Sequence, residues 1–196
     1  MSDTAPARPA SRFGTVEPAD LPDDLRERIE KIVEKTGFVP NVFRALARRP
    51  AELRAFMDYH DALMTPADDG PTLSAAEREL IVVATSGANH CTYCVVAHGA
   101  ILRIRAKDPE LPDVVAANPY GADLPPRERA IVDLALQIAT DSATLREDDL
   151  EAAREAGLTA EEIWDVGAIT ALFAMSNRLA HLTALRPNPE FFLLGR

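Results

Sequence analysis

The chain has 196 residues, of which 47% are hydrophobic and 27% are charged. This is the size and composition of one folded domain with a sizeable core. Acidic residues number 31 against 21 basic residues, so the formal net charge is −10. A surface of this sign repels phosphate backbones and anionic lipids, so we expect neither a nucleic-acid-binding nor a membrane-binding protein.

No run of the sequence is long and apolar enough to span a membrane, and the N-terminus lacks the apolar segment of a secretory signal. We therefore expect a cytoplasmic protein, a compartment in which thiols stay reduced. The two cysteines of such a chain are core residues, metal ligands or redox groups.

The expected organisation is an extended N-terminal arm over residues 1–20, a helical domain over 21–190 and a C-terminal tail over 191–196. Prolines and a lack of apolar periodicity mark the arm. Apolar residues then recur at helical spacing along most of the domain. The expected helices cover about residues 25–36, 53–64, 74–86, 90–107, 126–138, 147–156 and 163–185, with a loop at 67–71.

Two of these helices begin with a capping box, Ser74 with Glu77 and Thr159 with Glu162. No convincing strand pattern occurs, so the sequence predicts an all-α, single-domain bundle of about eight helices. The segment 73–78 resembles the segment 124–129, and two duplicated helical halves would explain this similarity.

The last long helix is apolar almost all round from Ile163 to Met175. Such a helix lies at the centre of a core or at a subunit contact. We therefore expect Trp164 and Phe173 in the core. Together with the apolar tail 191–194, this helix also predicts a homo-oligomer, because one small domain does not readily bury so much apolar surface.

The segment richest in reactive side chains contains a C-x-x-C pair, Cys91 and Cys94, followed four residues later by His98. On one helix these three residues fall within an arc of about 60°, whereas Tyr93 points the other way. The sulfurs lie one turn apart, close enough for a disulfide if Cys91 is at the helix end. The free N–H groups and the dipole at that end stabilise a thiolate.

The preceding helix carries Glu79, ten residues before Asn89, and His98 lies nine residues after it. If the two helices form an antiparallel hairpin around Asn89, Glu79 and His98 face each other. A carboxylate beside an imidazole fixes its tautomer and raises its basicity, so His98 can draw the proton from Cys94.

Other interpretations of these residues remain open. His90, Cys91, Cys94 and His98 are four potential zinc ligands, although adjacent ligands rarely suit tetrahedral coordination. The cysteines can also be mere core packing. A c-type haem site is excluded because Val95, and not a histidine, follows Cys94.

The remaining histidines of interest, His60 and His181, are expected to be structural. His60 extends the apolar stripe of Leu53, Phe56 and Met57, which indicates a packed core histidine. His181 lies among leucines late in the last helix.

The pattern of Glu79, Cys91, Cys94 and His98, with Ser86 and Asn89 before the first cysteine, resembles the alkylhydroperoxidase D-like branch of the carboxymuconolactone decarboxylase superfamily. The similarity is greatest to its peroxidase-related subgroup. It extends upstream to the segment 37–44 and covers about residues 20–190.

This resemblance implies an all-helical fold, a thiol-dependent peroxidase and a homo-oligomer, either a trimer or a hexamer. It implies that Cys94 is the peroxidatic cysteine, that Cys91 is the resolving cysteine, and that Glu79 and His98 form a proton relay. Well-known members have a histidine between the cysteines where this chain has Tyr93. The members that decarboxylate lack the C-x-x-C pair, so decarboxylation is not expected.

The expected reaction reduces a hydroperoxide without metal or cofactor, through a redox-active Cys91–Cys94 disulfide that an external dithiol reduces again. Two alternatives stay open: a general thiol–disulfide oxidoreductase, and a non-catalytic regulatory or interaction module on the same fold.

Overall fold

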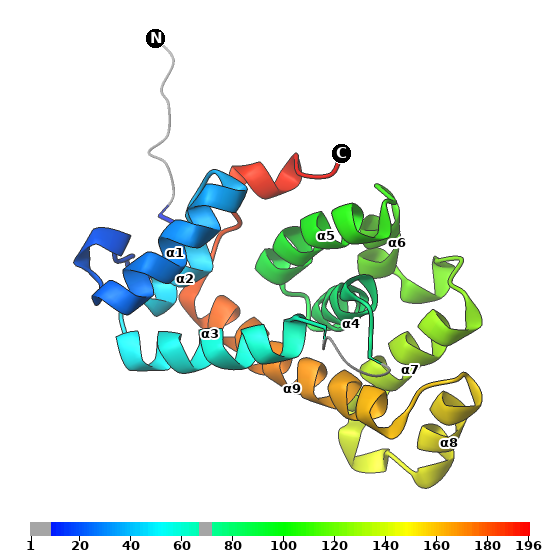
Figure 1. The fold of residues 1–196 in the computed structure, drawn as a ribbon. Helices are drawn as coiled ribbons and strands as arrows, with labels where there is room; N and C mark the ends of the chain where they lie inside the picture. Colours follow the sequence, from blue (N-terminus) through cyan, green and yellow to red (C-terminus); the bar gives the residue numbers. More distant parts are fainter. Residues whose placement is uncertain (1–8, 67–71) are drawn as a thin grey trace.

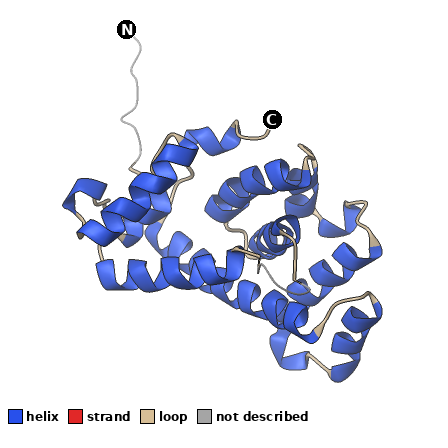
Figure 2. Cartoon of the chain, viewed as in Figure 1, coloured by secondary structure: helices blue, strands red, loops and turns tan. Residues whose placement is uncertain are grey.

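The computed structural model describes residues 9–66 and 72–196, and these residues form helices and loops without a strand (Figure 2). The all-α prediction is therefore confirmed. The α-helices are α1 (Asp23–Thr36), α2 (Asn41–Leu46), α3 (Pro50–Met64), α4 (Ala75–Ala88), α5 (Thr92–Ala106), α6 (Leu111–Ala117), α7 (Pro126–Asp141), α8 (Glu147–Glu155) and α9 (Ala160–Thr183). Short 3₁₀ helices are η1 (Pro18–Asp20), η2 (Pro119–Gly121), η3 (Ser142–Thr144) and η4 (Pro189–Phe192). The expected loop at 67–71 lies outside the described residues.

Local signals account for several helix ends. The backbone N–H of Glu77 donates to the Ser74 hydroxyl at 3.1 Å, and the Glu77 carboxylate accepts from the Ser74 N–H at 2.7 Å. The same reciprocal pair joins Thr159 and Glu162 at the start of α9. Both predicted capping boxes are confirmed.

Helix α4 is the centre of the fold, surrounded by α5, α6, α7 and α9 (Figure 1). Every residue from Glu77 to Ser86 is buried. Near its C-terminal end, α4 approaches α6 so closely that a Cβ on Gly87 would lie 2.7 Å from the carbonyl oxygen of Ala116. A side chain at position 87 would therefore push these two helices apart.

Helix α9 crosses beneath α4 and buries one face, which includes Phe173 as predicted (Figure 1). The prediction that Trp164 lies in the core is wrong, because 76% of this residue is exposed. Glu162, Val166 and Ile169 lie on the buried face of α9, and residue 164 points to the opposite side of the helix. An almost uniformly apolar helix gives no periodicity from which to choose its buried face.

Arginines join the elements of the bundle. Arg127 of α7 donates to Glu77 of α4 at 2.7 Å and to Glu162 of α9 at 2.6 Å. The similar segments 73–78 and 124–129 also share a structural feature: Arg78 and Arg129, at corresponding positions, each donate to backbone carbonyls of the loop before their helix.

Helices α1, α2 and α3 form a separate group, which we call the N-terminal lobe, on one side of the bundle (Figure 1). Its own small core contains Leu25 and Ile29 of α1 with Leu53 and Met57 of α3. Gly37 ends α1 in the left-handed conformation, with φ of 83°, as a C-terminal glycine should.

Both ends of the described chain pack on this structure. In the expected arm, Arg12 donates its backbone N–H to Thr183 at 2.8 Å, and Arg186 donates to Ala10 at 3.0 Å. At the other end, η4 runs across residue 191, where we expect the domain to end and the tail to begin. Phe191 is buried there, and Arg103 of α5 donates to its carbonyl at 2.9 Å. In the described part of the chain, no helix combines the length and the apolar character that a membrane crossing requires.

Candidate active site

The two cysteines lie at the start of α5, just after the turn that joins it to α4. The turn closes through a hydrogen bond from the Cys91 N–H to the Ser86 carbonyl at 2.9 Å, and His90 adopts a left-handed φ of 55° within it. Cys91 is the N-cap residue of α5, and Cys94 lies in its first turn. The position of Cys91 at the helix end therefore agrees with the prediction.

Glu79 and His98 meet across the α4–α5 hairpin as predicted. The Glu79 carboxylate accepts a hydrogen bond from Nδ1 of His98 at 2.8 Å. Only 7% of Glu79 is exposed, so water screens this contact weakly. The carboxylate holds the His98 proton on Nδ1 and leaves Nε2 as the basic nitrogen of the ring.

We expect His98 to reach the Cys94 sulfur directly or through one water, and no direct contact between them is among the described hydrogen bonds. The His98 ring packs instead against Phe173, with a centroid separation of 4.7 Å. The Ser176 hydroxyl of α9 lies 3.9 Å from the Cys94 sulfur, within hydrogen-bonding distance for sulfur. Both Cys94 and His98 border one cavity, so a proton can pass between them through water or substrate.

Both thiols are free and almost fully buried. The pKa of Cys91 is lowered to about 6, chiefly because the Cys94 thiol donates a hydrogen bond to its sulfur. The backbone N–H of Cys94, the His181 imidazole and the Asn177 side chain lower it further, against the effect of burial. The same thiol contact and burial raise the pKa of Cys94.

The contact between the thiols thus favours loss of one proton from the pair, with the other proton shared between the two sulfurs. We expect the Glu79–His98 pair to lower the pKa of Cys94, whereas burial and the contact with Cys91 act in the opposite direction. Cys91 occupies the N-cap position, so it is the Cys91 sulfur that the N–H of Cys94 reaches.

A buried polar network lies behind the sulfurs. Asn177 of α9 donates to the Ser86 hydroxyl at 3.0 Å and accepts from the Asn89 side chain at 3.0 Å. Ser86 and Asn89 belong to the pattern predicted from the sequence, whereas Ser176 and Asn177 do not. The available signal was that these two polar residues interrupt an otherwise apolar helix at neighbouring positions.

A cavity of about 630 Å³ separates the N-terminal lobe from α5 and α9, and Cys94 and His98 line it. Cavities of about 300–1,000 Å³ are typical of small-molecule sites. Cys91 is not among the lining residues, so a molecule in the cavity meets the Cys94 sulfur first.

His60 of α3 lines the same cavity. Its ring centroid lies 6.3 Å from that of His98 and 6.2 Å from that of Phe173. His60 therefore packs among aromatic rings, as expected, and one side of it also borders the cavity. Burial, followed by repulsion from His98, lowers the pKa of His60, so its ring is neutral at pH 7.

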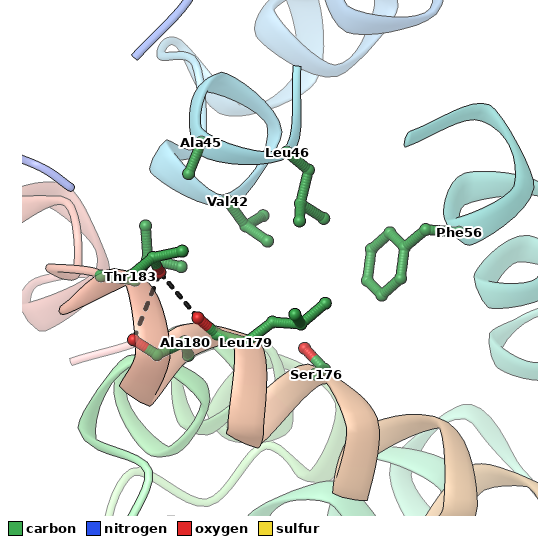
Figure 3. A pocket seen from close by; sticks show the side chains of 9 residues that line it. Val42, Ala45, Leu46, Phe56, Ser176, Leu179, Ala180 and Thr183 are labelled. Atoms are coloured by element: carbon green, nitrogen blue, oxygen red, sulfur yellow. Dashed lines mark hydrogen bonds between the residues drawn. The ribbon is translucent and has the colours of Figure 1, made fainter. Parts of the chain in front are cut away.

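The seam between α2 and the C-terminal half of α9 borders this cavity. Figure 3 shows Val42 and Leu46 of α2 facing Leu179 of α9, with Phe56 of α3 to one side. The remaining space is only about 10 Å³. This volume holds at most about one water molecule, so α2 and α9 pack closely along the seam.

Tyr93 and His181 have different surroundings. The Tyr93 hydroxyl accepts a hydrogen bond from the Val42 N–H at 3.1 Å, which fixes α2 to α5. Burial raises the pKa of Tyr93, so the residue anchors the lobe and is no proton relay at neutral pH. Nε2 of His181 lies 3.2 Å from the His90 carbonyl oxygen, which agrees with the structural role expected. In addition, His181 helps to lower the pKa of Cys91.

The zinc interpretation finds no geometric support. His90 is exposed whereas both cysteines are buried, and His98 is bound to Glu79. Within residues 9–66 and 72–196, no group of three or more histidine, cysteine or acidic side chains is arranged to hold a metal ion.

Comparison with known proteins agrees with this geometry. An uncharacterised peroxidase-related protein with an alkylhydroperoxidase AhpD core, from Ralstonia eutropha JMP134, is 56% identical to this chain. The match covers 97% of this chain and 98% of that one, with a TM-score of 0.92. The chain belongs to the alkylhydroperoxidase D-like branch of the carboxymuconolactone decarboxylase superfamily.

Further matches support this membership of the AhpD-like branch. The carboxymuconolactone decarboxylase family matches residues 50–117, which include the whole α4–α5 hairpin. An uncharacterised peroxidase-related protein from Silicibacter sp. TM1040 is 35% identical, covers both chains completely and has a TM-score of 0.87. The debrominase Bmp8 is 17% identical over 92% of this chain and 93% of its own, and its TM-score of 0.75 shows a shared AhpD-like fold alone. No curated protein shows significant similarity.

Proposed function

We propose that the protein is a thiol-dependent hydroperoxide reductase that uses Cys94 as the peroxidatic cysteine, Cys91 as the resolving cysteine and Glu79 with His98 as a proton relay. The observation that carries this proposal is the arrangement of the cavity, which exposes Cys94 but not Cys91 to a small molecule and places a carboxylate-bound histidine beside it. Membership of the AhpD-like branch supports the same activity.

The reaction begins when the shared proton moves from the Cys94 sulfur to the Cys91 sulfur, which leaves the charge on Cys94. The Cys94 thiolate attacks the terminal oxygen of R–O–O–H. The S–O bond forms as the O–O bond breaks, so Cys94 becomes a sulfenic acid and the leaving alkoxide takes a proton to give R–OH. Sulfur is oxidised by two electrons and the peroxide is reduced by two.

Disulfide formation completes the oxidation. Cys91 loses its proton, attacks the Cys94 sulfenic acid and forms the Cys91–Cys94 disulfide, and hydroxide leaves as water. An external dithiol then reduces the disulfide and restores both thiols. The sum is one hydroperoxide and one dithiol converted to one alcohol, one water and one disulfide.

Proton transfer is the task of the Glu79–His98 pair. Nε2 of His98 faces no described hydrogen-bond partner, and the ring borders the cavity, so Nε2 can take a proton from water and then hand it to the leaving alkoxide. The buried Glu79 stabilises the charged ring that forms when His98 takes a proton back from the thiols.

A general thiol–disulfide oxidoreductase is the second candidate. Its substrate disulfide has to reach a sulfur, yet Cys91 and Cys94 are only 1% and 2% exposed. A recessed cavity beside Cys94 suits a small peroxide better than a disulfide on a protein surface.

Thiol counting before and after one equivalent of cumene hydroperoxide tests the proposal. We expect both thiols to disappear, one equivalent of alcohol to form, and turnover to continue when a dithiol is added. Thiols that stay reduced in stoichiometric peroxide would instead indicate a non-catalytic module. Rapid reaction with a small disulfide, but not with peroxide, would favour the oxidoreductase.

We further propose that the chain forms a homo-oligomer, a trimer or a hexamer as its family resemblance implies. The outer face of α9 exposes Trp164, Met175 and Leu182 by 76%, 43% and 56%. Light scattering should give a mass above that of one chain, and Trp164→Glu should lower it. A wild-type protein that is monomeric at micromolar concentration would contradict this proposal.

A further inference from the structure

Three basic residues of α1 face the cavity. Arg28, Lys31 and Lys35 follow one another at helical spacing and all line the cavity. The five acidic residues of the same helix are absent from the lining, as is its remaining cation, Arg26. The N-terminal lobe therefore turns a basic face toward the cavity of a chain whose formal net charge is −10.

The two lysines are the cations of this face that have no ion-pair partner among the described residues. Arg28 is bound to Asp58 and Asp61 of α3, the second contact measuring 2.8 Å. Asp61 is the only acidic residue among the described lining residues. Its ion pair with Arg28 already compensates its negative charge. The chain has only three lysines, and two of them lie here.

The cavity between these lysines and Cys94 is mainly apolar. Lys31 and Lys35 are exposed, whereas Cys94 is buried, so the lysines mark the solvent side of the cavity and the sulfur its inner side. Phe56, Met57, Ile101, Phe173 and Phe191 are among the lining residues. A ligand that fits this surface has an apolar body and one anionic end.

We propose that the substrates are hydroperoxides of apolar carboxylic acids, with the carboxylate held by Lys31 and Lys35 and the hydroperoxide directed at Cys94. This inference rests on the proposed function, and the carboxylate itself undergoes no reaction. In a protein with an overall negative charge, a local pair of cations is needed to attract an anion to this cavity. Two lysines four residues apart lie one helical turn apart, close enough to contact the same carboxylate.

The test compares linoleic acid hydroperoxide with its methyl ester, both below the concentration at which micelles form. With excess dithiol, we expect kcat/KM for the acid to exceed that for the ester by about fivefold to tenfold, the range for exposed charge-assisted contacts. The ratio should fall toward one in the double variant Lys31→Gln/Lys35→Gln and return in Lys31→Arg/Lys35→Arg. It should also shrink as salt is added.

The third lysine, Lys107, provides a matched control. It is exposed at the end of α5, outside the cavity, so Lys107→Gln should keep the wild-type ratio. Equal kcat/KM values for acid and ester in the wild type, or a preference that survives in Lys31→Gln/Lys35→Gln, would overturn the inference.

A binding measurement separates this inference from the proposed function. Calorimetric titration with linoleate and with methyl linoleate needs no peroxide chemistry. Tighter binding of linoleate that is lost in Lys31→Gln/Lys35→Gln would support the carboxylate site even if the protein consumed no peroxide. A wild type that does not bind linoleate more tightly than its ester would overturn the site even if peroxide were reduced rapidly.

Discussion

The central bundle and the N-terminal lobe contribute different groups to the same cavity. The bundle supplies Cys91, Cys94, Glu79 and His98 from α4 and α5, all of them largely buried. The lobe supplies His60 from α3 and Lys31 and Lys35 from α1, which are more exposed. Groups that exchange protons and electrons need fixed geometry and weak screening, which the bundle interior provides. Groups that attract and select a substrate can lie nearer the solvent.

Replacing the sulfur that faces the cavity should have the largest effect. Cys94→Ser should lower peroxide turnover by about a thousandfold or more, because no other described thiol reaches the cavity. Cys91→Ser is the matched control, since it should allow one oxidation of Cys94 but no disulfide and no sustained turnover. The measurement is dithiol oxidation at saturating peroxide. Full turnover by Cys94→Ser would place the chemistry elsewhere.

The pH dependence should follow the first proton lost by the thiol pair. Because the pKa of Cys91 is lowered to about 6, the charge is present above pH 6 and is lost as the pH falls below it. The rate of peroxide reaction with the reduced protein should be flat near pH 8 and should fall about tenfold per unit below pH 6. Stopped-flow mixing over pH 4.5–9 measures it. A rate that still rises between pH 8 and 9 would show an unactivated thiol.

Removing the charge of Glu79 tests the relay within the bundle. Glu79→Gln should slow peroxide reduction about tenfold at neutral pH, because an amide cannot stabilise a protonated His98 ring. The fold should persist, since the amide has the same size and polarity, and circular dichroism checks this. Thiolate absorbance against pH for the wild type, Glu79→Gln and His98→Gln gives the second readout. Three identical curves would mean that the helix N-terminus alone activates the pair.

Changing His60 should have the smallest effect and tests the contrast between the two regions most directly. His60→Gln keeps a polar side chain at the cavity and should lower kcat/KM by only about threefold, with KM changed more than kcat. The neutral ring of His60 contributes a hydrogen-bonding surface, whereas His98 has the carboxylate partner. If His60→Gln slowed the reaction as much as His98→Gln, the lobe would take part in the chemistry.

The chemistry-bearing motif could be predicted because it is local. Glu79, Cys91, Cys94 and His98 lie within two consecutive helices, so helical rise and one turn determine which side chains face each other. The observed contact between Glu79 and His98 at 2.8 Å follows from that geometry. The capping boxes at Ser74 and Thr159 are local for the same reason.

Contacts between distant segments could not be predicted in this way. Ser176 and Asn177 lie more than 80 residues from the cysteines, and nothing in their own neighbourhood shows that α9 presents them to the sulfurs. Trp164 was assigned to the wrong side of α9 because an apolar helix has no periodic pattern that marks its buried face.

The sequence by itself determined the all-α fold and the pairing of Glu79 with His98, because hydrophobic periodicity, capping and helical geometry act over a few residues. Only the tertiary structure decided which sulfur faces the cavity, that the surroundings lower the pKa of Cys91, and that Lys31, Lys35 and His60 border the same space. These properties depend on how the N-terminal lobe packs against α5 and α9. That packing is a sum of many weak apolar contacts between distant segments, and no single motif encodes it.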